Sequence, residues 1–484
     1  MKKIFYLMAI MALLATTALA QTAALKSPGS RIIEGFKYEQ FELNLPEVGV
    51  EVDRVELKNG MILYLYEDHR LPIVNVYGLI RCGSIFDPPE KNGLSGLVGT
   101  VMRTGGSQTI SGDSLSILME YIGGTLETWV RSEEGGAQLN VLSKDLEMGL
   151  KLFADLLRNP AFPQEKLDLA KVDIKNSIKR RNDQPGAITE RYFSRTIYGD
   201  HPFGRILEWA SVKTITPDDM RDYHRRFFAP NNMMIAVSGD FKKADIIKKF
   251  EKYFGDWKKS EFPIPPYPPV EFGYKPGVYL VKKDINQANI RIGQLGVKRG
   301  NPDKYAIDLL NYILGGGSFT SRLTSRVRSD EGLAYSTGSS FSTNSRDYGT
   351  FYAYCQTKSS TAYKATKIIA EEIEKIRNEG VTEQELKEAR DAVINRFVFT
   401  FDNPAKIVQS LMNLEFDGYP ADYFKTYLDN YRKVNLEQMK MVAQKYLQSD
   451  SLTYLVVGKP EAFEKTLDEF GAVTIIELTD PVLE

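Results

Sequence analysis

Three histidines, His69, His201 and His224, are the first residues to consider for metal or acid–base chemistry. A helix-borne metal pair needs two ligands three or four residues apart, and no histidine has a second one at that distance. His69, in Glu-Asp-His-Arg, is typical of a solvated loop, and His201, in Gly-Asp-His-Pro, of a turn. The sequence contains no Gly-x-Ser-x-Gly nucleophile elbow. No metal pair or acyl-transfer site is therefore evident.

Two glycine-rich stretches remain. LGGGSFTSRL, residues 314–323, invites comparison with a phosphate loop but lacks the Gly-Lys-Ser/Thr ending that would reach a phosphate, which disfavours nucleotide binding. NGLSGLVGTVMRTGG, residues 92–106, follows a long apolar strand pattern. It predicts a helix built almost entirely from small residues, with little side-chain chemistry of its own.

The elements around that helix predict an α+β fold. Alternating residues on both sides of Lys58-Asn59-Gly60 indicate a hairpin, and Asp113 and Gly123 are the expected cap and stop of a later helix. The other expected elements are strands over 73–87, 125–142 and 232–239 and helices near 145–158, 163–182, 186–197, from 217, and ending at 254. Hairpin-connected strands favour a mostly antiparallel sheet with helices packed on one face.

The chain contains two copies of this domain. FPQEKL begins at Phe162 and matches VTEQEL, which begins at Val381, an offset of 381 − 162 = 219 in the numbering. Three further matches recur at the same offset: Pro185 with Pro404, ITPDDM with VNLEQM, and MMIAVSGD with LTYLVVGK. The proline-rich stretch 257–277 reads as a linker. We therefore expect homologous domains over 40–256 and 278–484, with the second repeating the element order of the first.

The ends and the composition indicate an exported protein. Residues 1–20 have two lysines, a short apolar run and a small-residue cleavage pattern, which predicts a signal peptide and no lasting membrane anchor. Without Lys2 and Lys3, the basic count of 62 − 2 = 60 faces 63 acidic residues, a charge of about −3 that gives no reason to expect nucleic acid as a partner. Cys82 and Cys355 are expected to be separate buried thiols, although an exported chain could pair them.

Residues 312–341, YILGGGSFTSRLTSRVRSDEGLAYSTGSSF, closely resemble the C-terminal-domain signature of the pitrilysin-type zinc peptidases, also called the insulinase or inverzincin family. That family includes mitochondrial processing peptidase. The resemblance covers essentially the whole mature chain, including the duplicated domains and the linker. It implies the bacterial and mitochondrial two-subunit type of this family.

The same resemblance gives a meaning to the small-residue helix. Active members carry His-x-x-Glu-His there, so that two histidines on one helical face hold zinc and the glutamate polarises water. Here Gly96, Gly99 and Thr100 occupy those slots. The slot of the third ligand, a glutamate, falls at Ser177, and that of a supporting glutamate falls at Ala170. With five slots vacated, we expect no metal and no catalytic residue in this chain.

The second half keeps the other part of the family site. Its signature Arg-x-x-x-Gly-Leu-Ala-Tyr is present, with Arg328 and Tyr335 as the arginine and tyrosine. In active members this pair reaches the zinc site, where the arginine binds the substrate backbone and the tyrosine stabilises the transition state. Without that setting, an arginine capping a helix end and a tyrosine packed in a strand would be the simpler interpretation.

The resemblance implies an exported, zinc-lacking subunit of a heteromeric metallopeptidase, with the periplasm as the expected compartment and no zinc peptidase activity alone. Its expected partner is a homologous subunit that carries the zinc, and its expected substrate is a peptide or unfolded protein, bound by strand addition. Two alternatives remain: a structural or peptide-binding protein without a role in proteolysis, and a peptidase that works through an unrelated site.

Overall fold

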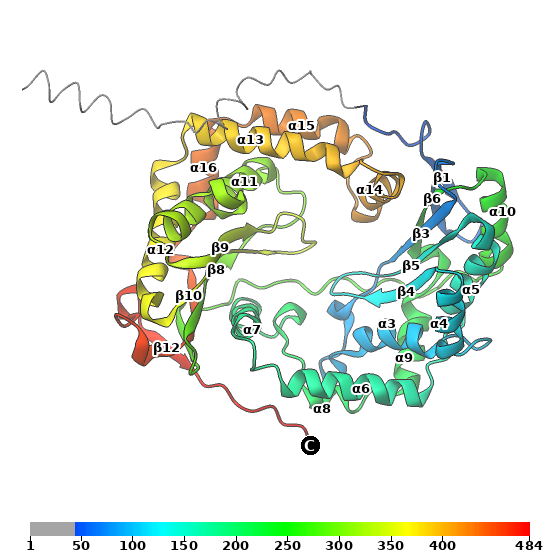
Figure 1. Cartoon of the computed structure of the whole chain (residues 1–484), viewed down its shortest axis with the longest axis horizontal. Helices are drawn as coiled ribbons and strands as arrows, with labels where there is room; N and C mark the ends of the chain where they lie inside the picture. Colours follow the sequence, from blue (N-terminus) through cyan, green and yellow to red (C-terminus); the bar gives the residue numbers. More distant parts are fainter. Residues whose placement is uncertain (1–43) are drawn as a thin grey trace, which may run out of the picture. The chain divides into compact units, whose positions relative to one another are not determined.

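Two six-stranded β-sheets, one from each half of the chain, form the framework of the structure (Figure 1). The computed structural model describes residues 44–484, so the predicted signal peptide, residues 1–20, lies outside the described part. The first half contains β1 (Asp53–Glu56), β2 (Ile62–Glu67), β3 (Ile73–Ile80), α3 (Leu94–Gly105), α4 (Gly112–Tyr121), β4 (Thr125–Val130), β5 (Gly135–Leu142), α5 (Leu146–Arg158), α6 (Gln164–Lys179), α7 (Pro185–Tyr198), α8 (Trp209–Val212), α9 (Pro217–Phe227), β6 (Met233–Gly239) and α10 (Lys243–Phe254). The second half contains β7 (Gly277–Lys282), β8 (Gln287–Leu295), α11 (Lys304–Asn311), β9 (Ala334–Phe341), β10 (Thr350–Lys358), α12 (Ala362–Glu379), α13 (Glu383–Phe397), α14 (Pro404–Asp417), α15 (Tyr423–Lys433), α16 (Leu436–Tyr446), β11 (Thr453–Gly458) and β12 (Val473–Ile476).

Both sheets are mostly antiparallel. The strand order is β1-β2-β6-β3-β5-β4 in the first and β12-β7-β11-β8-β10-β9 in the second. Neighbouring strands are antiparallel except β2–β6, β7–β11 and β7–β12. The predicted α+β fold of two homologous domains is therefore confirmed. Between α10 and β7, the stretch that reads as a linker contains no helix or strand.

The sequence repeat places the same helix-start signals in both halves. Thr216 begins α9 and Asn435 begins α16, and each forms a capping box with the residue three positions later, Asp219 or Gln438. Such a box satisfies two of the backbone groups that a helix start leaves unpaired. Prolines also stand at the first position of α7 and of α14. These repeated caps explain why the predicted helices agree closely with the observed ones.

Two sequence expectations are wrong in detail. Ser111, and not Asp113, caps α4, because its hydroxyl accepts a hydrogen bond from the Ser114 amide while Asp113 lies in the first turn. The second half also does not repeat the full element order. Its outer strand β12 comes from the chain's C-terminal end and pairs in parallel with β7, where the first half has the β1–β2 hairpin, and no long helix follows β11.

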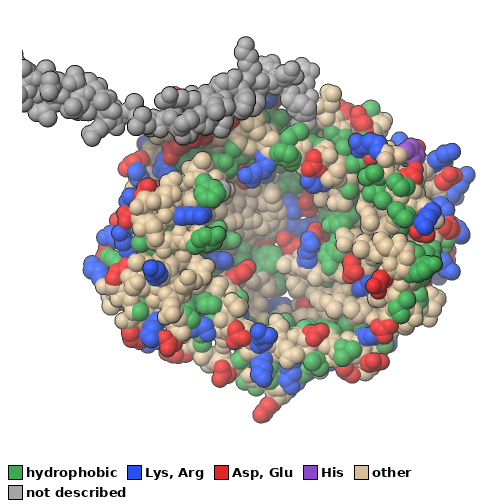
Figure 2. Space-filling model, viewed as in Figure 1, with side chains coloured by type: hydrophobic (Ala, Val, Ile, Leu, Met, Phe, Trp, Pro, Cys, Tyr) green, Lys and Arg blue, Asp and Glu red, His purple; other side chains and the backbone are tan. Residues whose placement is uncertain are grey.

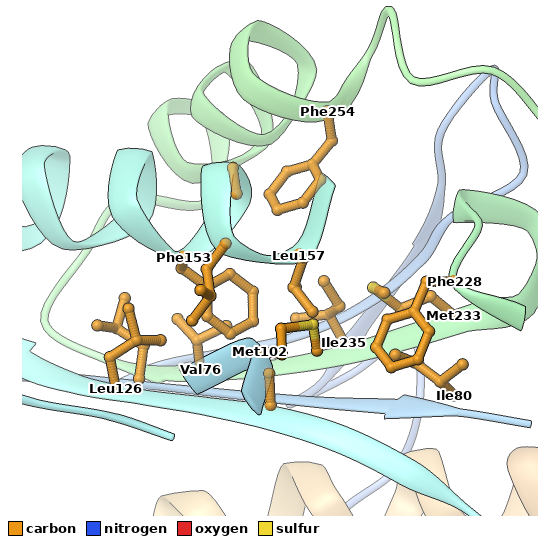
Figure 3. Close-up of a cluster of buried hydrophobic side chains, with 14 of the residues drawn as sticks. Val76, Ile80, Met102, Leu126, Phe153, Leu157, Phe228, Met233, Ile235 and Phe254 are labelled. Carbon is orange, nitrogen blue, oxygen red and sulfur yellow. The ribbon is translucent and has the colours of Figure 1, made fainter. Parts of the chain in front are cut away.

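Each sheet buries one face under helices of its own half. In the first half, strand residues such as Val76 and Ile235 share one core with Phe153 from α5 and Phe254 from α10 (Figure 3). The second half forms a corresponding core. Cys82 lies in the first core and Cys355 in the second, and both are free thiols whose pKa is raised by burial. The expectation of two separate buried thiols is confirmed.

The opposite face of each sheet receives a helix from the other half. Met412 and Phe416 of α14 pack against Met234 and Ala236 of the first sheet, and Ile188 and Phe193 of α7 join the second sheet's outer face. Arg54 of β1 also donates two hydrogen bonds of 2.7 Å to Glu415 of α14. Residues 45–484 therefore form one compact unit.

Charges of both signs are interspersed on the face seen in Figure 2. The whole sequence has 62 basic and 63 acidic residues, so neither sign dominates. None of the helices within residues 44–484 has the length and apolar character needed to cross a bilayer.

Candidate functional site

Helix α3, which carries three of the vacated slots, is fixed at its start by a buried carboxylate. The side chain of Asp87 accepts hydrogen bonds from the amides of Gly93 and Ser95 and from the Ser95 hydroxyl, at 3.0–3.3 Å. Gly93 supplies the left-handed backbone conformation, with φ of 103°, that opens the helix. Burial raises the pKa of Asp87 to about 7, against the opposing effect of these hydrogen bonds.

The glycine slots on α3 differ in the space around them. A β-carbon placed on Gly96 would meet no atom within 4 Å, whereas one on Gly99 would lie 2.5 Å from the backbone nitrogen of Val130 in β4. The Thr128 hydroxyl donates a 2.7 Å hydrogen bond to the Gly99 carbonyl and fixes this approach. The slot of the family's catalytic glutamate therefore has no room for a side chain while β4 keeps this position.

The slots on α6 are also without metal-binding chemistry. Ala170 packs half-buried against the first core, and Ser177 is exposed. Across residues 44–484, no group of three histidine, cysteine, aspartate or glutamate side chains is placed to hold a metal ion. Zinc requires such nitrogen, sulfur or carboxylate ligands. The residues present in the first half do not fit this metal.

The histidines lie apart and serve structural purposes. His69 is exposed between Asp240 and Glu67. Hydrogen bonds to these two carboxylates raise its pKa, and the bond to Asp240 has the larger effect. His201 lies 3.0 Å from the carbonyl oxygen of Pro268 in the linker. His224 is half-buried beside the Leu157 carbonyl, and desolvation of its ring lowers its pKa to about 4.

Arg328 and Tyr335 come together in the second half. The Arg328 guanidinium carbon lies 5.1 Å from the centre of the Tyr335 ring and 4.9 Å from that of Phe319. The three residues line a cavity of about 330 Å³. Tyr335 is 86% exposed and Phe319 69%. Two larger cavities, of about 1020 and 640 Å³, contain neither this pair nor the vacated slots.

No hydrogen bond or ion pair engages the Arg328 guanidinium within the described chain. Cation–π contact with both rings orients the guanidinium, whose N–H donors are available to a carbonyl or carboxylate. Tyr335 is too exposed to be a packing residue of its strand. The arrangement therefore differs from a helix-capping arginine and a buried strand tyrosine.

The backbone around the pair is irregular. Arg328 lies in the π-helical segment η8 (Thr324–Asp330), a helix type that is rare and frequent at functional sites. Gly332, with φ of 61°, turns the chain so that β9 begins at Ala334 on the free edge of the second sheet. The Leu333 amide donates to the Val327 carbonyl at 2.9 Å and closes the turn.

Sequence reasoning missed Phe319, which stands inside the glycine-rich stretch first compared with a phosphate loop. Gly315 in that stretch lies against β9: a β-carbon there would be 2.3 Å from the Ser339 amide nitrogen. This glycine allows a helical segment to pack closely on the strand. The sequence signal that could have identified Phe319 is its position, as an aromatic residue shortly after three glycines and shortly before Arg328.

Comparison with known proteins agrees with the fold and the repeat. Residues 64–210 match the model of the insulinase family, peptidase family M16, and residues 214–393 match that of the peptidase M16 inactive domain. The "uncharacterized zinc protease YmxG" of Bacillus subtilis is 26% identical over 354 residues, which covers 73% of this chain and 85% of the relative. A Rickettsia felis protein described as an "uncharacterized zinc protease" is 27% identical over 343 residues, which covers 69% of this chain and 80% of the relative.

Solved structures give the same fold. A "peptidase M16 inactive domain" from Pseudomonas fluorescens has a TM-score of 0.78 at 23% identity and covers 85% of this chain and 98% of its own. The "periplasmic protease PqqL" from Escherichia coli has a TM-score of 0.73 at 15% identity, covering 90% of this chain and 51% of its own. The duplicated sheets, the family matches and the Arg-Tyr signature agree, and the chain belongs to peptidase family M16.

Proposed function

We propose that this protein is the catalytically inactive, zinc-lacking subunit of an exported heteromeric metallopeptidase. It contributes Arg328 and Tyr335 to substrate binding at the zinc site of a homologous partner subunit. The observation that carries the proposal is an asymmetry between the halves. The first half has no metal ligand at any of the five slots and is closed at Gly99, while the second places Arg328 over the ring of an exposed Tyr335.

Each residue of the pair has a defined task in this proposal. The Arg328 guanidinium donates hydrogen bonds to a carbonyl of the bound peptide and fixes its position. The Tyr335 hydroxyl donates to the oxygen on which negative charge develops during attack on the peptide bond. The partner subunit supplies the metal and the water, so this chain alone performs no hydrolysis.

Export rests on the signal peptide predicted for residues 1–20, and the periplasm is the proposed compartment. Strand addition by the substrate is part of the same proposal, because β9 is an edge strand with free backbone groups beside Tyr335. A peptide or unfolded segment is the substrate class that such backbone recognition suits.

The test is peptide hydrolysis by the assembled enzyme with Arg328→Ala or Tyr335→Phe in this subunit. Removing a donor to the reacting group lowers kcat/KM by roughly 10- to 100-fold. Gel filtration should show that assembly is unchanged. Arg432→Ala and Tyr121→Phe are matched controls, because both side chains are exposed and lie outside this cavity. Unchanged turnover in both site variants would refute the role of the pair and favour a structural or peptide-binding function.

A further inference from the structure

The second half contains its own counterpart of the vacated zinc site. Strand pairing shows this when it is followed across each sheet from Val237 and Val456, which are equivalent in the sequence repeat because 456 − 237 = 219. In the first sheet, the paired residues lead from Val237 across β3 and β5 to Leu126 in β4. In the second sheet, they lead from Val456 across β8 and β10 to Thr337 in β9. The second position after each of these, Thr128 or Ser339, is therefore equivalent as well.

Both hydroxyls contact the same position on the helix beside them. Thr128 donates to the Gly99 carbonyl at 2.7 Å, and Ser339 donates to the side-chain oxygen of Asn311 at 2.8 Å and lies 3.4 Å from the Asn311 carbonyl. Asn311 is thus the counterpart of Gly99. Counting along the helix, Asp308 and Tyr312 take the places of Gly96 and Thr100, and the sequence repeat gives Arg396 as the counterpart of Ser177.

These four residues line one cavity of about 300 Å³ between α11, α13 and α15. Its chemistry is that of an anion site. Among the described residues, nothing pairs with the Arg396 guanidinium, the Tyr312 hydroxyl or the Asn311 amide nitrogen, so three kinds of donor are free. The Asp308 carboxylate is already engaged by Lys304 at 2.6 Å, Tyr431 at 2.8 Å and Thr343 at 2.8 Å.

The walls favour a carboxylate attached to an organic chain. Phe397 and Tyr427 stack at 4.6 Å and form an apolar side of the cavity. The volume is at the lower end of small-ligand pockets, about 300–1,000 Å³, which suits one residue of a peptide. Gly316 lines both this cavity and that of Arg328 and Tyr335, so the two cavities are neighbours.

We propose that this cavity binds the C-terminal carboxylate of a peptide, with Arg396, Tyr312 and Asn311 as donors. A guanidinium with neutral donors beside it is a suitable receptor for a carboxylate. The inference rests on the proposed function and extends it, since the same peptide would continue past Tyr335. It assigns a specificity for chain ends to the second half of the protein, at the counterpart of the vacated zinc site.

The test measures binding by this chain alone. Fluorescein-labelled octapeptides, randomised at every position, are titrated by fluorescence polarisation in three pools: a free C-terminal carboxylate, a C-terminal amide, and an amide with one internal glutamate. The free-acid pool should bind about tenfold more tightly than the plain amide pool, as expected for a charge-assisted hydrogen bond. Arg396→Gln should remove that difference. Lys387→Gln, which removes an exposed charge from the same helix outside the cavity, should leave it intact.

Three results would overturn the assignment: equal binding of free-acid and amide pools, a difference that survives in Arg396→Gln, or equally tight binding of the internal-glutamate pool, which would place the carboxylate on a side chain. Because no hydrolysis is measured, the assignment can fail while the role of Arg328 and Tyr335 in the assembled enzyme holds, and the reverse.

Discussion

His224 and His69 carry the same side chain in opposite surroundings. His224 is half-buried, stacks on Phe228 at 4.8 Å and lies 2.8 Å from the Leu157 carbonyl. His69 is exposed between two carboxylates. Burial therefore lowers the pKa of His224 to about 4, while the carboxylates raise that of His69. Neither histidine is placed for catalysis, and both link the protonation state to stability.

His224 should make the protein sensitive to acid. Its pKa is lower in the folded state than its ordinary value of 6.5, so the unfolded state binds the proton more readily, and stability is lost as the pH falls from 6.5 towards 4. The shift corresponds to roughly 3 kcal/mol. Between pH 7 and pH 4 the unfolding free energy of the native protein should fall. We expect the fall in His224→Gln to be smaller by about 3 kcal/mol, as measured by urea denaturation at each pH.

His69→Gln is the control with the opposite sign. Because the folded-state pKa of His69 is raised, its contribution is present below 6.5 and disappears as the pH rises through the folded value. The His69 variant should therefore lose stability at acidic pH only. Parallel pH profiles for the native protein and His224→Gln would contradict the account of His224.

Helix α3 and strand β4 show what the vacated slots have become. The sequence predicted the helix and its small residues correctly. Whether each glycine leaves space or fills a contact depends on the position of β4, which lies beyond α4 in the chain and returns to pack on α3. Local sequence carries no record of that approach, so the closure at Gly99 became visible only in the structure.

The two glycines should respond oppositely to alanine. Gly96→Ala adds a methyl group in open space and should stabilise the protein by about 0.5–1 kcal/mol through helix propensity. Gly99→Ala places a carbon against the Val130 backbone and should destabilise it by roughly 1–3 kcal/mol. Thermal or urea unfolding of both variants measures this. A Gly99→Ala protein as stable as Gly96→Ala would show that β4 moves freely and that the slot is not closed.

For the other elements too, features set by local sequence could be predicted, and features set by contacts between distant segments could not. The helix predicted from residue 217 begins there in the structure, because its start signals, Thr216 and Pro217, are adjacent in the sequence. The position of β12 was not found, because its pairing with β7 joins the two ends of the second half. Arg396 could have been found from the repeat alone, but its free donors and neighbouring cavity could not.

At the scale of the whole molecule, the two halves are joined by exchanged helices. α14 covers the outer face of the first sheet and α7 that of the second, so each half completes the packing of the other. No sequence pattern indicated this exchange, because an apolar helix face does not specify which sheet it covers. The consequence is that the half with vacated slots and the half with Arg328 and Tyr335 belong to one unit, which we propose acts as a whole beside a partner.

The most direct test is to purify the tagged full-length protein from its native cells, identify what accompanies it, and measure zinc content and peptide hydrolysis with and without that companion. The account predicts a homologous companion that carries His-x-x-Glu-His, zinc in the companion only, and hydrolysis only by the mixture. Zinc bound to this chain alone, or hydrolysis by this chain alone, would contradict it, as would purification without any peptidase companion.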